Sequence, residues 1–376
     1  MKRTDNPGRL GRRWNLAAAS VLLCGLAAQG GSANADEAFD AKAKQIFETA
    51  VAEQTAAPPS AGPKIIPGKS IVIIPCAMAA EGCARQARGV QEAATLVGWN
   101  ATLIDPAGDP AKMADAVQKA ISMKVDGIIL NSIDAAVVQG ALQQARDAGI
   151  KIVAMAMNQN NMFDATLPSN DNDKYFFDEG YTVAAAAYVL GDNKLRMLQL
   201  RDDEFGSVKA RADGSNQFIE DCKAAGGDCE LLASENTLVT NITTLVPKQA
   251  VSLVQRYPDY TMLWTGYDAA LSFVIQQGLV QAGLADKGFA VGFDANVANL
   301  TIIRDGGYER ATLGLPLERI GFALVDQMNR LLSGQSATED QGIRSRLLVK
   351  ANIPATGAWE GDVDFRAAYK KNWGVE

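Results

Sequence analysis

Residues 69–104 read KSIVIIPCAMAAEGCARQARGVQEAATLVGWNATLI, and this stretch decides the fold. Its first apolar run, Ile71 to Ile74, stops at Pro75, which is typical of a strand buried on both faces. Helical periodicity follows over 84–97, and the run 101–104 predicts a second strand. Two strands separated by a helix of this length pair in parallel through a right-handed crossover. The stretch is therefore predicted to be one βαβ unit.

The same alternation continues in two arrays along the chain. A loop that contains Pro168, Ser169, Asn170, Asp171 and Asn172 separates them. Neither array has the glycine-rich dinucleotide fingerprint or the phosphate-loop pattern, so nucleotide binding lacks its main sequence signal. The first array adds helix 111–122, strand 126–130, helix 135–147 and strand 151–156. The second has helices 173–190, 208–225, 244–256, 268–282 and 296–304, and strands 195–200, 229–233, 260–265, 288–292 and 310–315.

The first 35 residues have the order of a cleavable signal peptide. Lysine and arginine residues precede a mostly apolar stretch from Trp14 to Ala28, and small residues follow at Ala33-Asn34-Ala35. The apolar stretch is shorter than the roughly 20 residues that a transmembrane helix needs. Export to the periplasm is therefore predicted. The pair Arg12-Arg13 leaves the general secretory and twin-arginine routes both open.

Composition restricts the function further. The 376-residue chain carries a net charge of −7, which disfavours a nucleic-acid partner. It has no histidine, which removes the usual general base and the commonest metal ligand. No nucleophile–base pairing, cofactor loop or metal spacing is visible, so we expect a protein that is not an enzyme, with no cofactor and no metal.

Four cysteines remain after the predicted leader, as two pairs with the same short spacing. An even number in an oxidising compartment favours disulfides over metal binding. Four cysteines allow three pairings, and four buried free thiols are the alternative. The local pairings, Cys76–Cys83 and Cys222–Cys229, are favoured.

The chain resembles the type I periplasmic binding proteins, above all their ribose-binding branch. The resemblance rests on Val125-Asp126-Gly127-Ile128-Ile129-Leu130-Asn131, on 148–153, on Val291-Gly292-Phe293-Asp294, on Arg211 with Gly214, and on the run 306–320. It spans roughly 69–350. It implies two doubly wound parallel-sheet lobes, joined by a hinge with three crossings, with the ligand in the cleft between them.

Domain boundaries follow from the resemblance. The N-terminal lobe would take 69–169 and 316–342, and the C-terminal lobe would take 170–315 and 343–350. A helix with a proline-rich linker, 36–68, would precede the lobes. An extension, 351–376, would follow them and pack onto a lobe.

The resemblance also implies ligand contacts. Asn131, Arg211 and Asp294 match sugar-binding positions, where an amide, a guanidinium and a carboxylate can hold hydroxyl groups. Each also has a purely structural interpretation, as a turn cap, a helix-surface ion pair and a helix N-cap respectively. The other ligand-contact candidates are Tyr267, Asp268, Met157, Asn158 and Cys76.

Departures from the ribose pattern predict a less polar cleft. Ala156-Met157 stands where ribose receptors have an Asp-Arg pair, and Gly82 and Cys83 replace stacking phenylalanines. Tyr267 replaces an asparagine and Leu315 a glutamine. We therefore expect a solute with fewer hydroxyls than an aldopentose, such as a polyol or a modified sugar, or else a small carboxylate held by Arg211.

The resemblance implies a monomeric solute receptor that delivers its ligand to an ABC transporter permease in the inner membrane. A sensory receptor that presents ligand to a chemotaxis or kinase partner needs the same closing cleft. The sequence does not separate these two functions.

Overall fold

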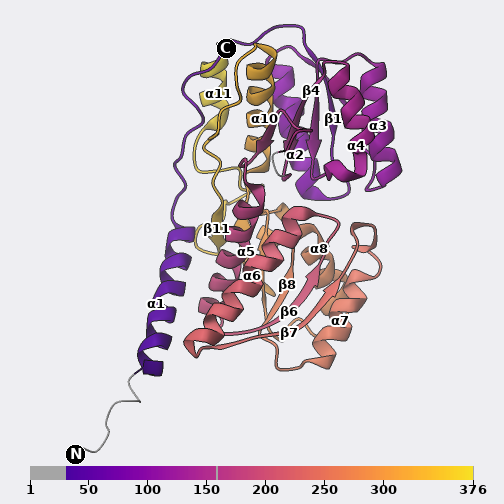
Figure 1. Cartoon of the computed structure of the whole chain (residues 1–376). Coiled ribbons are helices and arrows are strands. Elements are labelled where there is room, and N and C mark those ends of the chain that lie inside the picture. Colours follow the sequence, from indigo (N-terminus) through magenta and orange to yellow (C-terminus); the bar gives the residue numbers. More distant parts are fainter. Residues whose placement is uncertain (1–30, 158–159, 376) are drawn as a thin grey trace, which may run out of the picture.

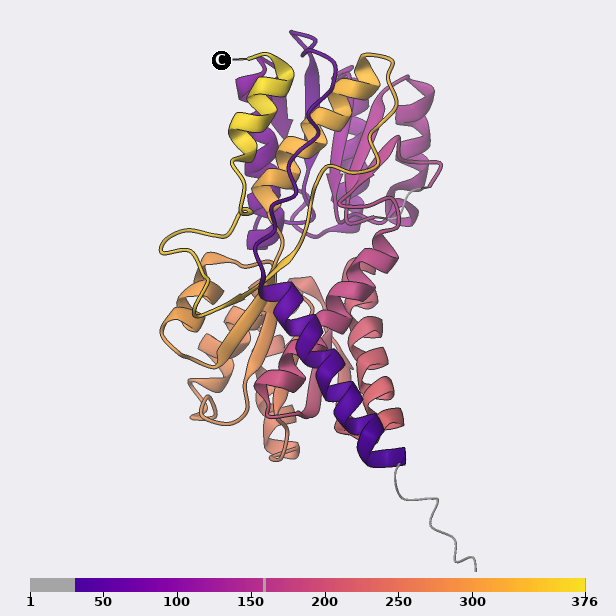
Figure 2. The same cartoon turned by 90° about the vertical axis from the view of Figure 1, so that its left-hand side faces the viewer.

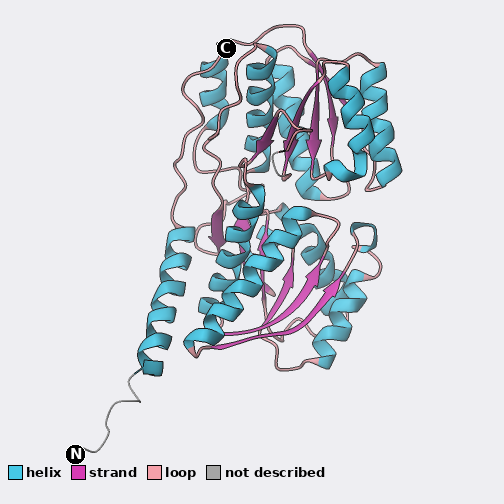
Figure 3. Ribbon diagram, viewed as in Figure 1, coloured by secondary structure: helices cyan, strands magenta, loops and turns pink. Residues whose placement is uncertain are grey.

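The computed structural model describes residues 31–157 and 160–375, and they form two lobes (Figure 1). The predicted leader up to residue 30, and Asn158, lie outside the described residues. Each lobe is a twisted sheet between helices, as Figure 3 shows. The predicted α/β class and the two doubly wound lobes are confirmed.

The sheet of the N-terminal lobe is entirely parallel, in the order β2-β1-β3-β4-β5. Apolar runs bury its inner strands on both faces, which is why their sequences do not alternate. The elements of this lobe are β1 (Ser70–Ile74), α2 (Glu81–Leu96), β2 (Asn100–Leu103), α3 (Pro110–Ser122), β3 (Gly127–Asn131), α4 (Ala135–Asp147), β4 (Lys151–Met155), β5 (Ala165–Leu167), α10 (Leu317–Leu332) and α11 (Phe365–Trp373).

The C-terminal lobe has two three-stranded ladders, β7-β6-β8 and β11-β10-β9, which a bridge between Met262 and Phe289 joins. Only β11 runs antiparallel to its neighbour within the described chain. The elements are α1 (Gly31–Val51), α5 (Asn172–Leu190), β6 (Lys194–Arg201), α6 (Gly206–Ala225), β7 (Asp228–Asn236), α7 (Val246–Arg256), β8 (Met262–Thr265), α8 (Asp268–Phe273), β9 (Ala290–Phe293), α9 (Val297–Arg304), β10 (Glu309–Gly314) and β11 (Arg346–Val349).

The helix predicted over 268–282 differs from the observed one. It runs as α8 only to Phe273 and then widens into a π-helical turn over Val274–Leu279. The short strands β5 and β11 were not predicted, because three or four residues carry too little periodicity to mark a strand.

Three connections cross between the lobes at the hinge: 168–171, 315–316 and 333–345. Two further connections of the described chain also run from the C-terminal to the N-terminal lobe. They are 52–69, from α1 to β1, and 350–364, from β11 to α11. Figures 1 and 2 show both running alongside the hinge. Helix α1 packs on the C-terminal lobe, where Phe39 meets Tyr188 and Phe218. Helix α11 packs on the N-terminal lobe, where Trp373 stacks on Phe322.

Helices α2 and α10 of the N-terminal lobe cross at two glycines, Gly89 and Gly321. A Cβ added to Gly89 would collide with the backbone of Glu318, and one added to Gly321 would collide with the backbone of Gly89. The missing side chains therefore allow the two helices to touch.

Gly89→Ala is expected to destabilise the protein by about 1–3 kcal/mol, because the new methyl group must separate two packed helices. Chemical denaturation measures the effect. Gly140→Ala is the matched control, since Gly140 is a helical glycine with open space around it. It should stabilise the protein by up to about 1 kcal/mol through helix propensity. Equal effects of the two substitutions would show that the close crossing does not matter.

Candidate ligand-binding site

A cavity of about 80 Å³ lies between the lobes. About half of its lining comes from residues at or just after the carboxyl ends of strands in both lobes, where ligands bind in open parallel sheets, and the rest from neighbouring helices. The two lobes are in contact beside the cavity, since Gly108 of the N-terminal lobe lies next to the Val239 side chain of the C-terminal lobe. The lining residues at strand ends are Cys76 after β1, Asn131 at the end of β3, Ala156 after β4, Phe205 and Ser207 after β6, Val239 after β7, Tyr267 after β8, Asp294 after β9 and Leu315 after β10.

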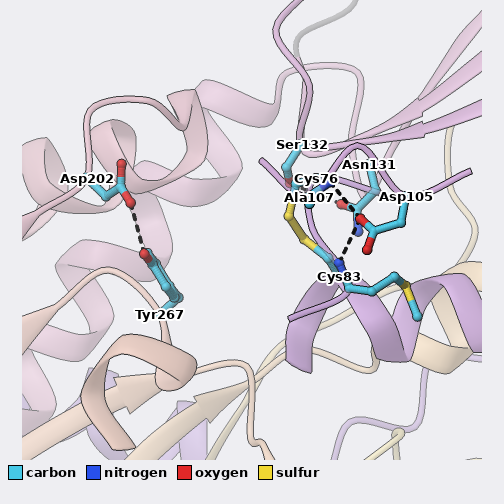
Figure 4. Close-up of a disulfide and its surroundings, with 9 residues drawn as sticks. Cys76, Cys83, Asp105, Ala107, Asn131, Ser132, Asp202 and Tyr267 are labelled. Carbon is cyan, nitrogen blue, oxygen red and sulfur yellow. Dashed lines mark hydrogen bonds between the residues drawn. A yellow bond between two sulfur atoms is a disulfide. The ribbon is translucent and has the colours of Figure 1, made fainter. Parts of the chain in front are cut away.

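A disulfide forms one wall of the cavity. Cys76 bonds to Cys83 and ties the loop after β1 to the first turn of α2. Figure 4 shows this disulfide next to Asn131 and Ser132. The second predicted disulfide, Cys222–Cys229, is also present, so the local pairing is confirmed. The wall at Cys76 is therefore apolar and is tied down covalently.

Asn131 supplies a polar group to the same lobe. Its side chain is buried, and its Oδ1 accepts a hydrogen bond from the Ser132 hydroxyl at 3.0 Å. Its Nδ2 makes no hydrogen bond within the described residues. The residue lines the cavity, so a solute there can accept a hydrogen bond from this amide.

Arg211 lies opposite, on α6 of the C-terminal lobe, and is buried. Its Nε donates to one oxygen of Glu179 at 2.9 Å, and its Nη2 lies 2.8 Å from the same oxygen. Its Nη1 donates to the Gly266 carbonyl at 2.8 Å. Its Nη2 also lies 3.3 Å from Asp294 Oδ1. Each guanidinium nitrogen therefore has an acceptor from the protein itself.

The surroundings of Arg211 explain its charge state. Its guanidinium carbon lies 4.4 Å from the ring centre of Phe293 and 5.1 Å from that of Phe176. Burial alone would lower the pKa of Arg211, but Glu179 and Asp294 raise it above its usual value. Burial raises the pKa of Glu179, although Arg211 opposes the shift. The positive charge of Arg211 is therefore paired with two acidic side chains, those of Glu179 and Asp294.

Asp294 follows β9 in a left-handed conformation with φ 87°. Its Oδ1 faces Arg211. Its Oδ2 lies close to Gly82 of the other lobe, where a Cβ would come within 3.4 Å. The carboxylate therefore sits where the two lobes meet, and Oδ2 can accept a hydrogen bond from a hydroxyl in the cavity.

Tyr267 lines the cavity with its ring, and its hydroxyl donates to Asp202 at 2.9 Å. Its ring meets the edge of Phe205 with the ring centres 6.0 Å apart. Figure 4 shows Tyr267 and Asp202 on the far side from the disulfide. Burial, together with the carboxylate of Glu204, raises the pKa of Asp202 to about 7, while the hydrogen bond from Tyr267 acts to lower it.

Two of the predicted ligand residues do not line this cavity. Asp268 is fully buried, and its carboxylate accepts the N–H groups of Phe293 and Asn296 at 2.8 and 3.0 Å. Its structural role is to shape the loop that carries Asp294. Met157 lines a separate small hollow beside Phe205 and Glu204. The predicted residues that the structure does bring to the cavity are Cys76, Asn131, Arg211, Tyr267 and Asp294.

Two residues that support the site, Asp202 and Glu179, were not predicted from the sequence. Asp202 directly follows β6, at the carboxyl end of a parallel strand, and that position is the signal by which it could have been predicted. Glu179 lies within helix α5, and no local pattern distinguishes it from a surface acid.

Other kinds of site were sought in the described residues. In 31–157 and 160–375, no cluster of three or more cysteine and carboxylate side chains could hold a metal ion. No helix in that part of the chain is long and apolar enough to cross a membrane.

Residues 71–336 match the family model described as a periplasmic binding protein domain. The chain belongs to the periplasmic binding protein family. A search of curated proteins with this sequence finds no match.

Solved structures share the fold of this periplasmic binding protein. An ABC sugar transporter subunit from Rhodobacter sphaeroides is similar with a TM-score of 0.66 at 18% identity, over 76% of this chain and 99% of that one. A solute-binding protein from Mycobacterium smegmatis with bound glycerol gives 0.66 at 19% identity, over 78% and 100%. One from Bacillus halodurans with bound myo-inositol gives 0.64 at 18%, over 76% and 96%. At these identities the likeness establishes the fold.

Asp202→Asn should make the stability of this periplasmic binding protein depend less on pH. The pKa of Asp202 is raised from near 4 in the unfolded chain to about 7 in the folded one. The native state then holds a proton that the unfolded state loses, so this contribution is complete below pH 4 and is lost as pH rises through 7. Each unit of pKa difference corresponds to about 1.4 kcal/mol.

Thermal unfolding midpoints between pH 4 and 8 measure this effect as the difference between wild type and variant. Asp203→Asn is the control, because the neighbouring Asp203 is exposed. If Asp202→Asn follows the wild-type profile as closely as the control does, the burial argument fails.

Proposed function

We propose that this protein is the solute receptor of an ABC uptake transporter. It captures a small neutral solute, such as a polyol or a modified sugar, and delivers it to a permease in the inner membrane as a monomer, without chemical conversion. Residues 1–35 act as the export signal to the periplasm. The lobes that close on the solute are 69–169 with 316–342, and 170–315 with 343–350.

The observation that carries this proposal is the charge balance around Arg211. A carboxylate ligand would need a free guanidinium, but Glu179 and Asp294 already hold this one. Placing a third carboxylate beside two others without a further cation is unfavourable. The small-carboxylate alternative is therefore disfavoured, and a neutral ligand fits.

The lining of the cavity argues for few hydroxyl groups. Polar groups come from Asn131 and Ser132 in one lobe and Asp294 in the other, and these can pair with hydroxyls of a solute. The rest of the wall is mostly apolar, and a hydroxyl facing it would lose its hydrogen bonds to water without replacement. The apolar lining includes the disulfide, Met155, Phe176, Phe205, Val208, Leu315 and Leu317.

Similar structures support a neutral ligand but not its number of hydroxyls, since two neighbours hold the fully hydroxylated sugars D-arabinose and tagatopyranose. Glycerol and myo-inositol are bound in two proteins of the same fold. Another neighbour, from Thermotoga lettingae, holds 5-methylthioribose, in which one hydroxyl of a sugar gives way to an apolar thioether.

A thermal-shift screen tests the proposal, after unfolding and refolding to remove any retained ligand. Polyols, deoxy and modified sugars should raise the unfolding temperature, and sugar acids and small carboxylates should not. A ligand at 100 times its Kd should stabilise by about 2.7 kcal/mol, which is several degrees for a protein of this size. Stabilisation by carboxylates alone would contradict a neutral ligand.

Asp294→Ala should weaken binding of the best neutral ligand by about 10-fold to 100-fold, because it removes a charge-assisted hydrogen bond of about 1.5–3 kcal/mol. Isothermal titration calorimetry measures the change. Asp305→Ala is the matched control, since it removes the same charge from an exposed position in the same lobe. Unchanged affinity in Asp294→Ala would show that the solute binds elsewhere.

A further inference from the structure

Arg85 joins the two lobes. It lies on α2 of the N-terminal lobe and is fully buried. Its Nη1 nevertheless reaches the loop after β9 in the C-terminal lobe, where it donates to the carbonyls of Asp294 at 2.7 Å and Ala295 at 3.2 Å, and to Oδ1 of Asn296 at 2.9 Å. The arginine therefore holds the backbone of the residue that presents its carboxylate to the cavity.

The C-terminal extension supplies the counter-charge. Glu360 accepts from both Nε and Nη2 of Arg85, at 3.0 and 2.7 Å, and the Trp359 carbonyl accepts from Nη2 at 2.9 Å. The second oxygen of Glu360 accepts the N–H of Glu318 at the start of α10. Glu360 is thus held to the N-terminal lobe and keeps the guanidinium in one orientation.

The backbone of the loop after β9 has a strained conformation that needs stabilising contacts such as those of Arg85. Asp294 and Ala295 both have positive φ, 87° and 57°, a conformation that non-glycine residues adopt only when the surroundings impose it. Asp268 holds this loop from within the C-terminal lobe, through the N–H groups of Phe293 and Asn296. Arg85 holds it from the other lobe, so its bonds exist only while the lobes are together.

A second contact crosses at the same place. Glu81, in the first turn of α2, accepts the N–H of Val297 at 3.1 Å. The first turn of α2 therefore approaches the start of α9 directly, with Gly82 next to the Asp294 carboxylate. The interface is continuous from the cavity to the C-terminal extension.

We propose that Arg85 is a positioning residue that couples closure of the lobes to the orientation of Asp294, and that Glu360 of the C-terminal extension is required for this coupling. When the lobes separate, Arg85 keeps its two hydrogen bonds to Glu360 and loses its three acceptors at 294–296. When they close, the oriented guanidinium meets those acceptors. The role goes beyond solute binding, because it sets the balance between open and closed lobes without any ligand.

Spin labels on the two lobes test the proposal. Val137→Cys on α4 and Leu245→Cys just before α7 place labels at exposed positions near the cleft. Cys24→Ser leaves these as the only free thiols, since the other four cysteines form disulfides. Distances are measured by double electron–electron resonance on ligand-free protein.

Wild type should populate the short distance of the closed arrangement. Arg85→Lys keeps the charge but loses the fork that reaches several acceptors at once, and Glu360→Gln loses the ion pair. Both should shift population from the short to a longer distance. Distance distributions that match wild type in both variants would overturn the proposal.

A matched control separates this role from general stability. Arg330→Lys alters another buried arginine of the N-terminal lobe, which pairs with Asp326 on its own helix. It should lower the unfolding temperature without changing the interlobe distance. If it lengthens the distance as much as Arg85→Lys does, Arg85 has no specific role. Glu360→Gln still decides the question if Arg85→Lys does not fold. Because no ligand is involved, the result is independent of the solute screen.

Discussion

The site depends on one electrostatic constraint, the burial of the Arg211 guanidinium. A buried charge is tolerated only when it is paired and hydrogen-bonded. Glu179 from α5 and Asp294 from the loop after β9 meet this need, and Ser345 at the end of the hinge donates to the other oxygen of Glu179. Tyr175 on α5 bonds to the same serine. A continuous polar chain therefore runs from the hinge to the cavity.

Helix packing makes this pairing possible. Helices α5 and α6 approach so closely at Gly180 that a Cβ there would collide with the backbone of Arg211, and Gly214 meets Phe177 in the same way. Gly180 directly follows Glu179, so the close crossing brings the acid to the arginine. The short apolar strands, the glycine crossings and the ion pair together fix the position of Asp294 at the cavity. Arg85, in the opposite lobe, donates hydrogen bonds to the same loop.

Much of this arrangement could be predicted from sequence, because local patterns specify it. Apolar runs bounded by helical periodicity predicted the parallel strands of both lobes, and the equal spacing of the cysteines favoured the two disulfides that are observed. Asn131 and Asp294 were predicted from the resemblance to sugar receptors, and the structure brings both to the cavity because each follows or ends a parallel strand. Glu179 and Arg85 were not found, since each lies inside a helix and its partners are distant in sequence. Asp268 does not line the cavity, because its carboxylate turns toward the backbone N–H groups of the loop after β9.

The most direct measurement of the central claim is native mass spectrometry of the protein purified from the periplasm without denaturation, followed by identification of the small molecule that it releases. The account predicts one bound molecule per chain, uncharged, with few hydroxyl groups and an apolar part. A stoichiometric carboxylate or sugar acid would contradict it, since the charge of Arg211 would then have to be free to meet the ligand.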